Sequence, residues 1–557
     1  MSNYTPSGPR TDDSESLFSL EERLLREERR LADAVLRRTR IFAEIAARRK
    51  DGKRRDTGQD FEKAIWKVWE SVLQSEEAGH SRHWRQLVSQ CNNLGQAYSE
   101  QKFSRKGKTW LLRPLAPAKA ITLAGPADIF STKIISFWAA VTNAPARIRP
   151  VVLNDDLIEL IKSLNQTGAG LAWENETISH TPRRTPELSL EQKTIHVGQS
   201  TFTLALMVAL AMARPGIAKF SGSGALNMFS IKPWQAVLPH LGARLHQLNP
   251  HAPGLPVRLE SSGQPSQVQI DADTPMDLIL ALLAAAPFFP QGLDLTWLDH
   301  PIAAPELETL FLLYSTFNVP FTRLPNGFRV SPAMPRLPEQ PRIPLDYFLN
   351  SMLLAWSRMT RQQITLHGNW PEGSSAGDHL DLLRSCGVQI ETGPDYIRAT
   401  PESWPESPVL DIQGQEQALP LAILLALCAP KGCTVSCQFE ITNLDFITEM
   451  ARWAGRDCLP EQGEVRFAPA PHPTDRGDGI FEAPDSRWGM ALAMLSFRFP
   501  GPRLTNPGEL TALWPGFWPI HQSVLSLAKQ RTEDPSSRLS ESPSNESSRT
   551  GKRRVKI

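Results

Sequence analysis

The chain has 557 residues, of which 41% are apolar and 21% are charged, and its formal net charge is +1. This composition is ordinary for a globular protein, and the length predicts roughly two to four domains. A net charge so close to zero excludes a global attraction to nucleic acid or membrane, so we expect neither as a partner. The longest apolar stretch, Leu278–Phe289, is shorter than the roughly 18 residues that span a bilayer. Met1–Glu15 lacks the apolar core of a secretion signal, and we therefore expect a cytoplasmic protein.

The first hundred residues are charged and show a helical pattern. Residues 1–15 are polar and are predicted to be disordered. Residues 16–103 are predicted to form an all-α unit of three helices, at Leu17–Lys50, Phe61–Gln74 and His83–Glu100. The apolar stripe of so long a first helix must be buried, so we expect this unit to form a homodimer through its helices. Residues 104–123, rich in Lys, Arg and Pro, are predicted to be a linker.

After the linker, one unit recurs six times: an apolar helix, a Gly or Pro break, and a short β-like run. The helices are predicted at Ser131–Val141, Ser200–Ala213, Thr274–Phe289, Leu345–Met359, Glu416–Cys428 and Asp485–Phe499. Strands are predicted at Ile217–Phe220, Leu293–Thr296, Gln363–Leu366 and Cys433–Ser436. A second helix closes most units at Gly168, Gly242, Asn318, Gly387 and Gly455. The period of roughly 70 residues is too long for a solenoid repeat and fits a complete βαβαββ unit.

Two Pro-rich joints, near 123–126 and 336–341, divide the six units. We therefore predict an α/β fold with two lobes of three βαβαββ repeats, one at 124–338 and one at 339–528 together with 110–123. The chain would then cross between the lobes twice. Residues 529–557 have almost nothing to bury and are predicted to be a disordered tail. The six cysteines show neither a disulfide framework nor a metal-ligand spacing, so we expect reduced thiols, no metal site and no cofactor.

Six units in two lobes resemble the fold of the enolpyruvyl transferases. Over about Trp110–Leu527, five phrases in order resemble the EPSP synthase (3-phosphoshikimate 1-carboxyvinyltransferase) family: Val268-Gln269-Ile270-Asp271, Gly377-Asp378-His379, Asp395-Tyr396-Ile397, Asp485-Ser486-Arg487-Trp488 and Trp514-Pro515-Gly516-Phe517. The resemblance implies transfer of an enolpyruvyl group from phosphoenolpyruvate to shikimate 3-phosphate, in the shikimate pathway of aromatic amino-acid biosynthesis. The related transferase for a UDP-amino sugar uses a loop cysteine, and none lies between Cys91 and Cys386. RNA 3′-phosphate cyclase shares the repeat but has fewer copies.

The N-terminal helices resemble the all-helical chorismate mutases, whose product lies on the same pathway. In that family, cations hold the two carboxylates of chorismate and a donor contacts its ether oxygen. Arg38, Arg49 and Gln96 match those substrate-binding positions, whereas Glu21 stands where an arginine is expected. The resemblance therefore implies a mutase-like unit that binds chorismate if it is active.

The cations that enolpyruvyl transfer requires are mostly replaced in this chain. Two anionic substrates share one cleft, so the family surrounds them with Lys and Arg and supplies an acid and a base. Asp128 stands where the family has a lysine, and Asp277 ends the segment that matches a Ser-Ser-Gln triplet. Glu306 ends the segment that matches a Lys-Pro-Tyr group, whose lysine is Ala304 here. We expect these three acids to be helix N-caps or first-turn acids. Other cations are lost in segments 197–203, 227–230 and 440–443, and the late lysine is Ala512.

Two cations remain at family positions and are the predicted substrate-binding residues of the cleft, Arg487 and Lys133. The catalytic residues cannot be assigned. Three hypotheses stay open: a divergent EPSP-synthase-family enzyme with a rearranged site, a non-catalytic pseudoenzyme that acts as a scaffold in the same pathway, and chorismate mutase activity from the N-terminal unit. If the protein is active, its partners are the anionic small molecules shikimate 3-phosphate, phosphoenolpyruvate or chorismate.

Overall fold

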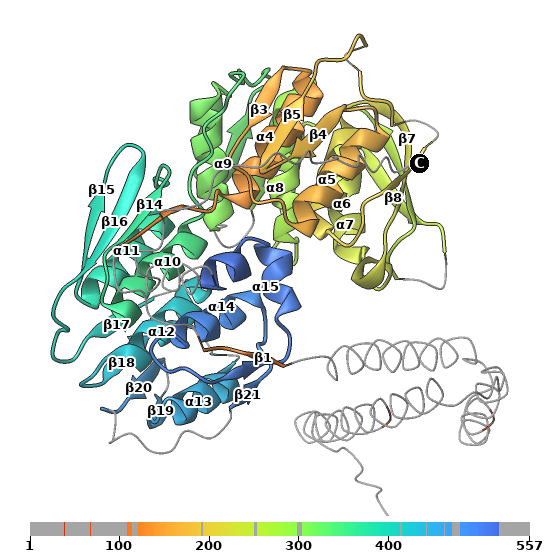
Figure 1. Ribbon diagram of the computed structural model, residues 1–557. Helices are drawn as coiled ribbons and strands as arrows, with labels where there is room; N and C mark the ends of the chain where they lie inside the picture. The colour runs from red at the N-terminus through yellow and green to blue at the C-terminus, as the bar shows by residue number, and fades with distance from the viewer. Residues whose placement is uncertain are drawn as a thin grey trace, which may run out of the picture. The chain divides into compact units, whose positions relative to one another are not determined.

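The computed structural model describes Arg38, Lys67 and residues 109–113, 120–185, 187–190, 193–249, 253–297, 304–412, 415–439, 441, 443–461, 463–469 and 479–522. The chain divides into two compact units, Met1–Trp110 and Leu111–Ile557. Figure 1 shows the second unit as a set of small sheets and helices. In the first unit, Arg38 and Lys67 each lie in a helix. The rest of the predicted three-helix unit, residues 1–15 and the tail at 529–557 lie outside the described residues.

The second repeat shows how one unit is built. Its elements are β6 (Thr194–His196), α6 (Thr201–Met212), β7 (Pro215–Ser221), α7 (Lys232–Val237), a 3-10 turn (Leu238–Leu241), β8 (Ala243–Gln247) and β9 (Val257–Ser262). The strand order is β6-β7-β9-β8, with β6 and β7 parallel and the other pairs antiparallel. A parallel pair requires a crossover, and α6 provides it on one face of the sheet.

The third and fifth repeats use the same strand order. The third contains β10 (Gln267–Ile270), α8 (Met276–Ala285), β11 (Leu293–Trp297), α9 (Pro305–Thr316), β12 (Phe321–Leu324) and β13 (Gly327–Val330). The fifth contains β17 (Val409–Asp411), a 3-10 turn (Glu416–Ala418), α12 (Leu419–Cys428), β18 (Cys433–Ser436), α13 (Leu444–Trp453), β19 (Cys458–Glu461) and β20 (Glu464–Phe467).

The strand that precedes the first repeat belongs to the sheet of the fourth repeat. The first has α4 (Ile129–Thr142), β3 (Ala146–Ile148), α5 (Asp155–Gln166), β4 (Leu171–Glu174) and β5 (Thr177–His180). The fourth has α10 (Tyr347–Thr360), β14 (Ile364–His367), α11 (Ser374–Ser385), β15 (Val388–Thr392) and β16 (Tyr396–Pro401). The strand before α4, β2 (Ile121–Ala124), pairs in parallel with β14 and completes the fourth sheet. The chain therefore leaves the second lobe after β2 and returns to it before α10.

The sixth repeat is the shortest. It contains β21 (Ile480–Phe481), α14 (Ser486–Leu495), β22 (Arg503–Leu504) and α15 (Gly508–Leu513). Its three-stranded sheet is completed by β1 (Trp110–Leu111), in the order β1-β22-β21. The second lobe thus combines strands from both sides of the first lobe in the sequence: β1 and β2 come before α4, and its other strands come after β13.

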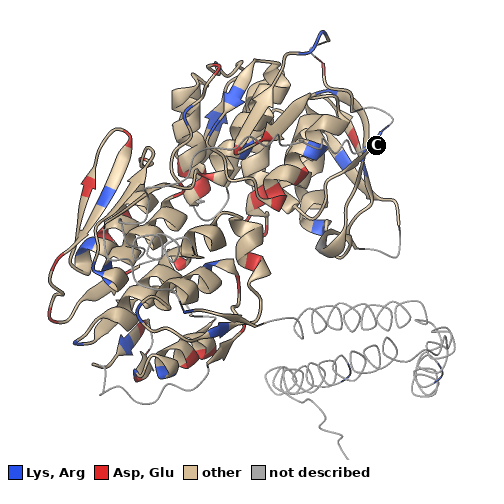
Figure 2. Cartoon of the chain, in the orientation of Figure 1, with Lys and Arg blue, Asp and Glu red and all other residues tan. Residues whose placement is uncertain are grey.

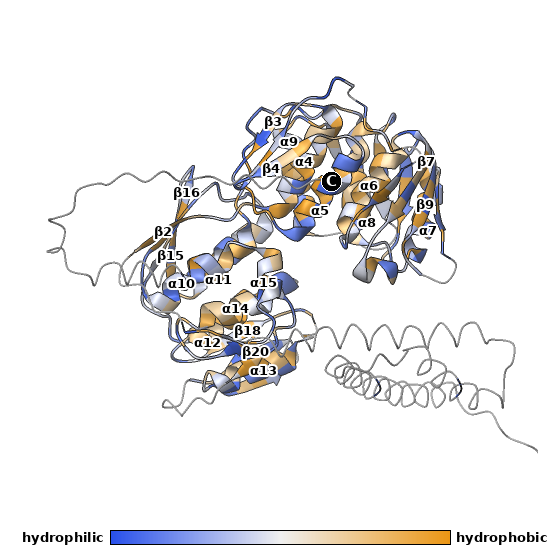
Figure 3. Ribbon diagram, turned by 45° about the vertical axis from the view of Figure 1, so that its right-hand side comes forward, coloured by the Kyte–Doolittle hydropathy of each residue, from blue (hydrophilic) through white to orange (hydrophobic). Residues whose placement is uncertain are grey.

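Each lobe has its own apolar core around three inner helices. One core joins buried residues from Ala127 to Ile343, and the other is formed mainly by residues from Leu345 to Trp518. The inner helices α6, α8 and α12 are apolar on all sides, which is typical of a helix that is buried all round. Figure 3 shows α6 and α8 largely in the hydrophobic colour. The boundary between the cores lies at Ile343–Leu345, just after the Pro-rich joint at 336–341.

The predicted two-lobed α/β fold of six repeats is confirmed, and the six predicted helices match α4, α6, α8, α10, α12 and α14 within a few residues. Four glycines and Asn318 close the outer helices with a positive φ, between 56° and 95°, as Gly or Asn does after a helix C-terminus. The five described cysteines are free. None of the helices in the described ranges is long and apolar enough to cross a membrane.

Candidate functional site

A cavity of about 1540 Å³ lies between the two lobes, and both lobes contribute to its walls. The first lobe supplies residues at the N-terminal ends of α4, α5, α6, α8 and α9, and the second those of α10, α11 and α14. Helix N-termini carry unpaired N–H groups and a partial positive charge, so helices arranged in this way form an anion-binding framework. The fold therefore presents a cleft whose backbone is suited to anions.

The side chains of the cleft have the opposite charge. The acidic residues of its lining are Asp128, Asp155, Asp156, Glu159, Asp277, Glu306, Glu308, Asp346 and Glu416, and the basic residues are Lys133, Lys162, Arg323 and Arg487. Figure 2 shows acidic segments at the ends of the first lobe's helices that face the second lobe. Nine acidic against four basic side chains give the lining of this cleft an excess of negative charge, which disfavours an anionic ligand.

Lys133, a predicted substrate-binding residue, lines the cleft but is already engaged. Its side chain is only 6% exposed, and its ammonium forms an ion pair with Asp156 in the first turn of α5. The ammonium also lies 5.4 Å from the centre of the Phe202 ring. The ion pair neutralises the charge that a substrate anion would need, and an anion could bind Lys133 only by displacing Asp156.

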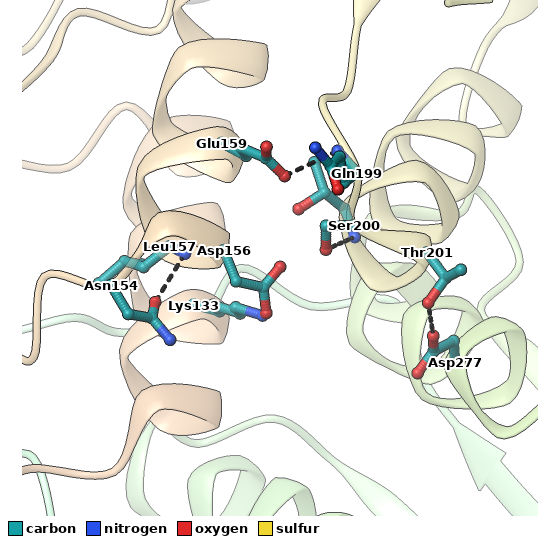
Figure 4. A network of polar contacts seen from close by, with 10 residues as sticks. Lys133, Asn154, Asp156, Leu157, Glu159, Gln199, Ser200, Thr201 and Asp277 are labelled. Carbon is teal, nitrogen blue, oxygen red and sulfur yellow. Dashed lines mark hydrogen bonds and ion pairs between the residues drawn. The ribbon is translucent and has the colours of Figure 1, made fainter. Parts of the chain in front are cut away.

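Two further carboxylates occupy helix starts in the first lobe (Figure 4). Glu159 of α5 accepts a 2.9 Å hydrogen bond from the backbone N–H of Gln199, just before α6. The Glu159 carboxylate lies so close to Gly198 that a Cβ there would come within 2.1 Å of it. Asp277, in the first turn of α8, accepts a hydrogen bond from the Thr201 hydroxyl. The chain thus places its own carboxylates where the fold would otherwise receive an anion.

Asp128 and Asp346 cap the first helix of each lobe. Asp128 accepts a 2.6 Å hydrogen bond from the N–H of Ser131, and Asp346 a 2.8 Å bond from that of Leu349. Desolvation raises the pKa of both carboxyls above the ordinary value, that of Asp346 to about 7. The charge of Asp128 raises the pKa of Asp346 further, whereas Arg487 lowers it.

Arg487, the other predicted substrate-binding residue, lies in the first turn of α14 and lines the cleft. The N-cap Asp485 accepts hydrogen bonds of 2.8 and 3.1 Å from the backbone N–H groups of Arg487 and Trp488. The guanidinium lies 5.7 Å from the centre of the Phe348 ring, and the described residues place no carboxylate within ion-pair distance of it. Its charge therefore remains available to a ligand.

Glu308 connects the two lobes. It lies in the first turn of α9, and its carboxylate accepts hydrogen bonds from the Ser374 hydroxyl and, at 3.5 Å, from the Ser375 N–H at the start of α11. The N-cap of α11, Gly373, has no side chain to cap the helix, so the opposite lobe supplies the cap.

Replacing Glu308 and Ser374 by Ala, singly and together, should show a coupling free energy of about 0.5–1 kcal/mol, because the pair forms one partly exposed charged contact. Urea unfolding of the four proteins measures it. The pair Glu308→Ala and Ser385→Ala is the control, since Ser385 lies at the opposite end of the same helix. Strictly additive effects of Glu308→Ala and Ser374→Ala would show that the contact contributes nothing.

His379 and Tyr347 form the wall behind Arg487. His379 is 1% exposed, its Nδ1 lies 2.9 Å from the Ser375 carbonyl oxygen, and its ring lies edge-on to Tyr347 at 4.9 Å. Burial lowers the pKa of His379 to about 4, so the imidazole is neutral at physiological pH. It adds no positive charge to the cleft.

Some residues of this cleft have the structural position that the sequence predicts, and others have contacts that the sequence did not predict. Asp128 is a helix N-cap, and Asp277 and Glu306 are first-turn acids, as predicted. Arg38 is half-buried in its helix, while Arg49 and Gln96 lie outside the described residues. The partners Asp156, Glu159, Glu308 and Asp346 were not predicted. A signal in the sequence could have identified these acidic residues, because several helices of the repeats carry an acidic residue near their start.

No three His, Cys, Asp or Glu side chains in the described ranges are arranged to hold a metal ion. The carboxylates of the cleft are instead spread over separate helix starts, and five of them accept hydrogen bonds from backbone N–H or hydroxyl groups of this chain: Asp128, Glu159, Asp277, Glu308 and Asp346.

Comparison with known proteins identifies the framework. A sequence model of EPSP synthase (3-phosphoshikimate 1-carboxyvinyltransferase) matches residues 119–518. The 3-phosphoshikimate 1-carboxyvinyltransferase of Syntrophobacter fumaroxidans is 23% identical over 426 residues, which are 74% of this chain and 99% of that protein. The protein of the same name from Nitrosopumilus maritimus is 22% identical over 297 residues, 52% of this chain and 68% of that protein.

Solved structures agree on the fold. EPSP synthase from Acinetobacter baumannii superposes with a TM-score of 0.59 at 13% identity, covering 75% of this chain and 97% of that one. The enolpyruvyl transferase NikO from Streptomyces tendae superposes with a TM-score of 0.54 at 15% identity, covering 74% and 96%. With a family match over most of its length and the same two-lobed fold, this chain belongs to the EPSP synthase family.

Proposed function

We propose that this protein is a non-catalytic member of the EPSP synthase family, retained in the shikimate pathway as a binding or scaffolding protein. The observation that supports the proposal is the charge of the interlobe cleft. Nine carboxylates and four cations line it, and one of those cations, Lys133, is neutralised by Asp156. Even with Asp128 and Asp346 both protonated, the remaining carboxylates outnumber the cations.

The free energy that the replaced cation contacts would have contributed supports the same conclusion. A charge-assisted hydrogen bond to an anion contributes about 1.5–3 kcal/mol. The loss of four such contacts corresponds to roughly 6–12 kcal/mol, or about four or more powers of ten in rate at tenfold per 1.4 kcal/mol. Repulsion by the carboxylates at α4, α6 and α8 adds to this loss, because phosphoenolpyruvate and shikimate 3-phosphate both carry phosphate and carboxylate groups.

Enolpyruvyl transfer releases phosphate, and phosphate release therefore tests the proposal directly. The full-length chain is incubated with shikimate 3-phosphate and phosphoenolpyruvate, beside the Syntrophobacter fumaroxidans relative as a positive control. We expect a rate lower than the control's by a factor of about 10⁴ or more. A rate within a hundredfold of the control would contradict the proposal and support a divergent enzyme with a rearranged site.

Within this cleft, we assign the one remaining anion position to Arg487. Its guanidinium is planar, permanently charged and placed at a helix start, which suits carboxylate or phosphate. Calorimetric titration of shikimate 3-phosphate should show weak binding to the wild type and at least a tenfold loss in Arg487→Ala. Arg323→Ala is the matched control, because Arg323 lines the same cleft and packs on an aromatic ring at 5.5 Å. Equal binding by wild type and Arg487→Ala would remove Arg487 from the site.

A further inference from the structure

The two chain crossings between the lobes lie side by side and are joined by backbone hydrogen bonds. Ala127 on the first crossing forms an isolated antiparallel bridge with Leu345 on the second. The Asp128 N–H donates to the Pro344 carbonyl at 2.9 Å, and the Asp346 N–H donates to the Pro126 carbonyl at 3.0 Å. The two bonds are reciprocal, and both are donated by the aspartates that follow the bridged pair.

The crossing is tightly packed around the buried amide of Asn350. Its Nδ2 donates to the Pro126 carbonyl at 2.8 Å and to the Asp346 carbonyl at 2.7 Å, so it holds both crossings. Gly125 leaves room for it, since a Cβ at that position would come within 2.4 Å of the Asn350 Oδ1. This short segment is the place where the chain crosses between the two lobes, and we call it the hinge.

Asp128 and Asp346 carry the two carboxyl groups of this hinge, and both side chains are half-buried. Each caps the helix that follows its own crossing, α4 or α10. When both carboxyls are ionised, two like charges lie on neighbouring strands whose connection depends on the N–H groups of the same two residues. Their repulsion in a partly desolvated site opposes the hinge hydrogen bonds.

Charged and titratable groups from the surrounding helices do not neutralise this pair. Glu306 of α9 adds a third negative charge beside Asp128, and the Lys133 of α4 that faces it is engaged by Asp156. Arg487 of α14 faces Asp346 and favours its ionised form. Tyr347 of α10 faces the same carboxyls, and their negative charges raise its pKa beyond the strong effect of burial. One cation thus faces three carboxyls.

We propose that Asp128 and Asp346 together retain one proton at the hinge at and below neutral pH, and that its release to solvent at higher pH loosens the crossing between the lobes. The direction of this pH dependence follows from the surroundings of the two carboxyls. Desolvation raises the pKa of both carboxyls, and the charge of Asp128 raises that of Asp346 further, to about 7, so Asp346 loses its proton as the pH rises through this value. Because the two groups interact, the proton belongs to the pair and not to either residue.

Hydrogen exchange of the full-length protein at pH 6 and pH 8, corrected for intrinsic exchange rates, tests the proposal. Peptides that cover 124–130 and 343–349 contain the hinge amides. We expect their protection to fall at least tenfold between pH 6 and pH 8 in the wild type, while protection of β9 stays constant. In Asp128→Asn and Asp346→Asn the fall should disappear, because Asn caps a helix as well as Asp but carries no charge.

Asp485→Asn provides the matched control, since Asp485 also caps a helix at the cleft but lies outside the hinge. It should retain the full wild-type response. A wild type whose hinge protection does not depend on pH would overturn the proposal. So would an equal loss in β9, which would indicate global unfolding, or a wild-type response in both hinge variants. Loss of the response in Asp485→Asn would also overturn it, because the effect would then not be specific to the pair.

Discussion

Replacing Asp346 by Asn should raise the midpoint of thermal unfolding at pH 8 by a few degrees and leave it unchanged near pH 4. The folded-state pKa of Asp346, about 7, lies above its ordinary value, so between these pH values the folded protein binds more protons than the unfolded chain. Stability contributed by the protonated group is therefore lost as the pH rises towards 7. Because the side chain is partly exposed, we expect a gain of about 1–2 kcal/mol in the variant at pH 8.

Calorimetric unfolding at both pH values measures this difference, since about 1 kcal/mol corresponds to roughly 2–4 °C in a domain of 150–250 residues. Asp485→Asn, which replaces an exposed N-cap that accepts two backbone N–H bonds, is the control and should not raise the unfolding midpoint at pH 8. A variant no more stable than the wild type at pH 8 would show that the Asp346 carboxylate is adequately solvated in the folded protein.

Replacing Trp138 by Ala should destabilise the first lobe by about 3–5 kcal/mol. The Trp138 side chain is fully buried, and its Nε1 donates a 2.9 Å hydrogen bond to the Ala284 carbonyl. The ring stacks on Tyr314 at 6.0 Å and meets Phe317 edge-on at 6.0 Å. Trp138 therefore connects α4 to α8 and α9, and its removal leaves a cavity between these three helices.

Urea unfolding followed by tryptophan fluorescence and by circular dichroism measures the loss. Trp173→Ala is the matched control, because Trp173 is 38% exposed on β4, and its effect should stay within about 0.5 kcal/mol. A loss below about 1 kcal/mol in Trp138→Ala would mean that the lobe refills the cavity by repacking.

The family assignment explains why the fold survives while the cleft has changed. The inner helices bury apolar side chains on every face, and their packing does not depend on which residues stand at their N-terminal ends. Substitutions such as Asp128 or Asp277 at those ends remain compatible with the helix, because a carboxylate is a good cap or first-turn residue. The packing of the framework therefore does not depend on the charge of the side chains at these helix starts.

Most of the helices and turns of the repeats can be predicted from the local sequence alone. A helix such as α6 is recognisable because twelve consecutive residues are nearly all apolar, and the chain must turn at Gly168 or Asn318 because these residues adopt a positive φ readily. Such signals are local, since they depend on neighbours within one or two turns. The prediction that Asp128 and Ala512 stand where the family has lysines is also local, because it needs only the order of residues along the chain.

Which charged side chains contact one another depends on the tertiary structure. Lys133 is neutralised by a residue 23 positions away, and Glu308 reaches a serine 66 positions away in the other lobe. The pairing of β2 with β14 joins segments more than 200 residues apart, and it brings Asp128 next to Asp346. Such contacts depend on how helices and crossings pack in three dimensions. No periodicity along the chain encodes them, because ion pairs and pKa shifts depend on distance and desolvation, not on sequence separation.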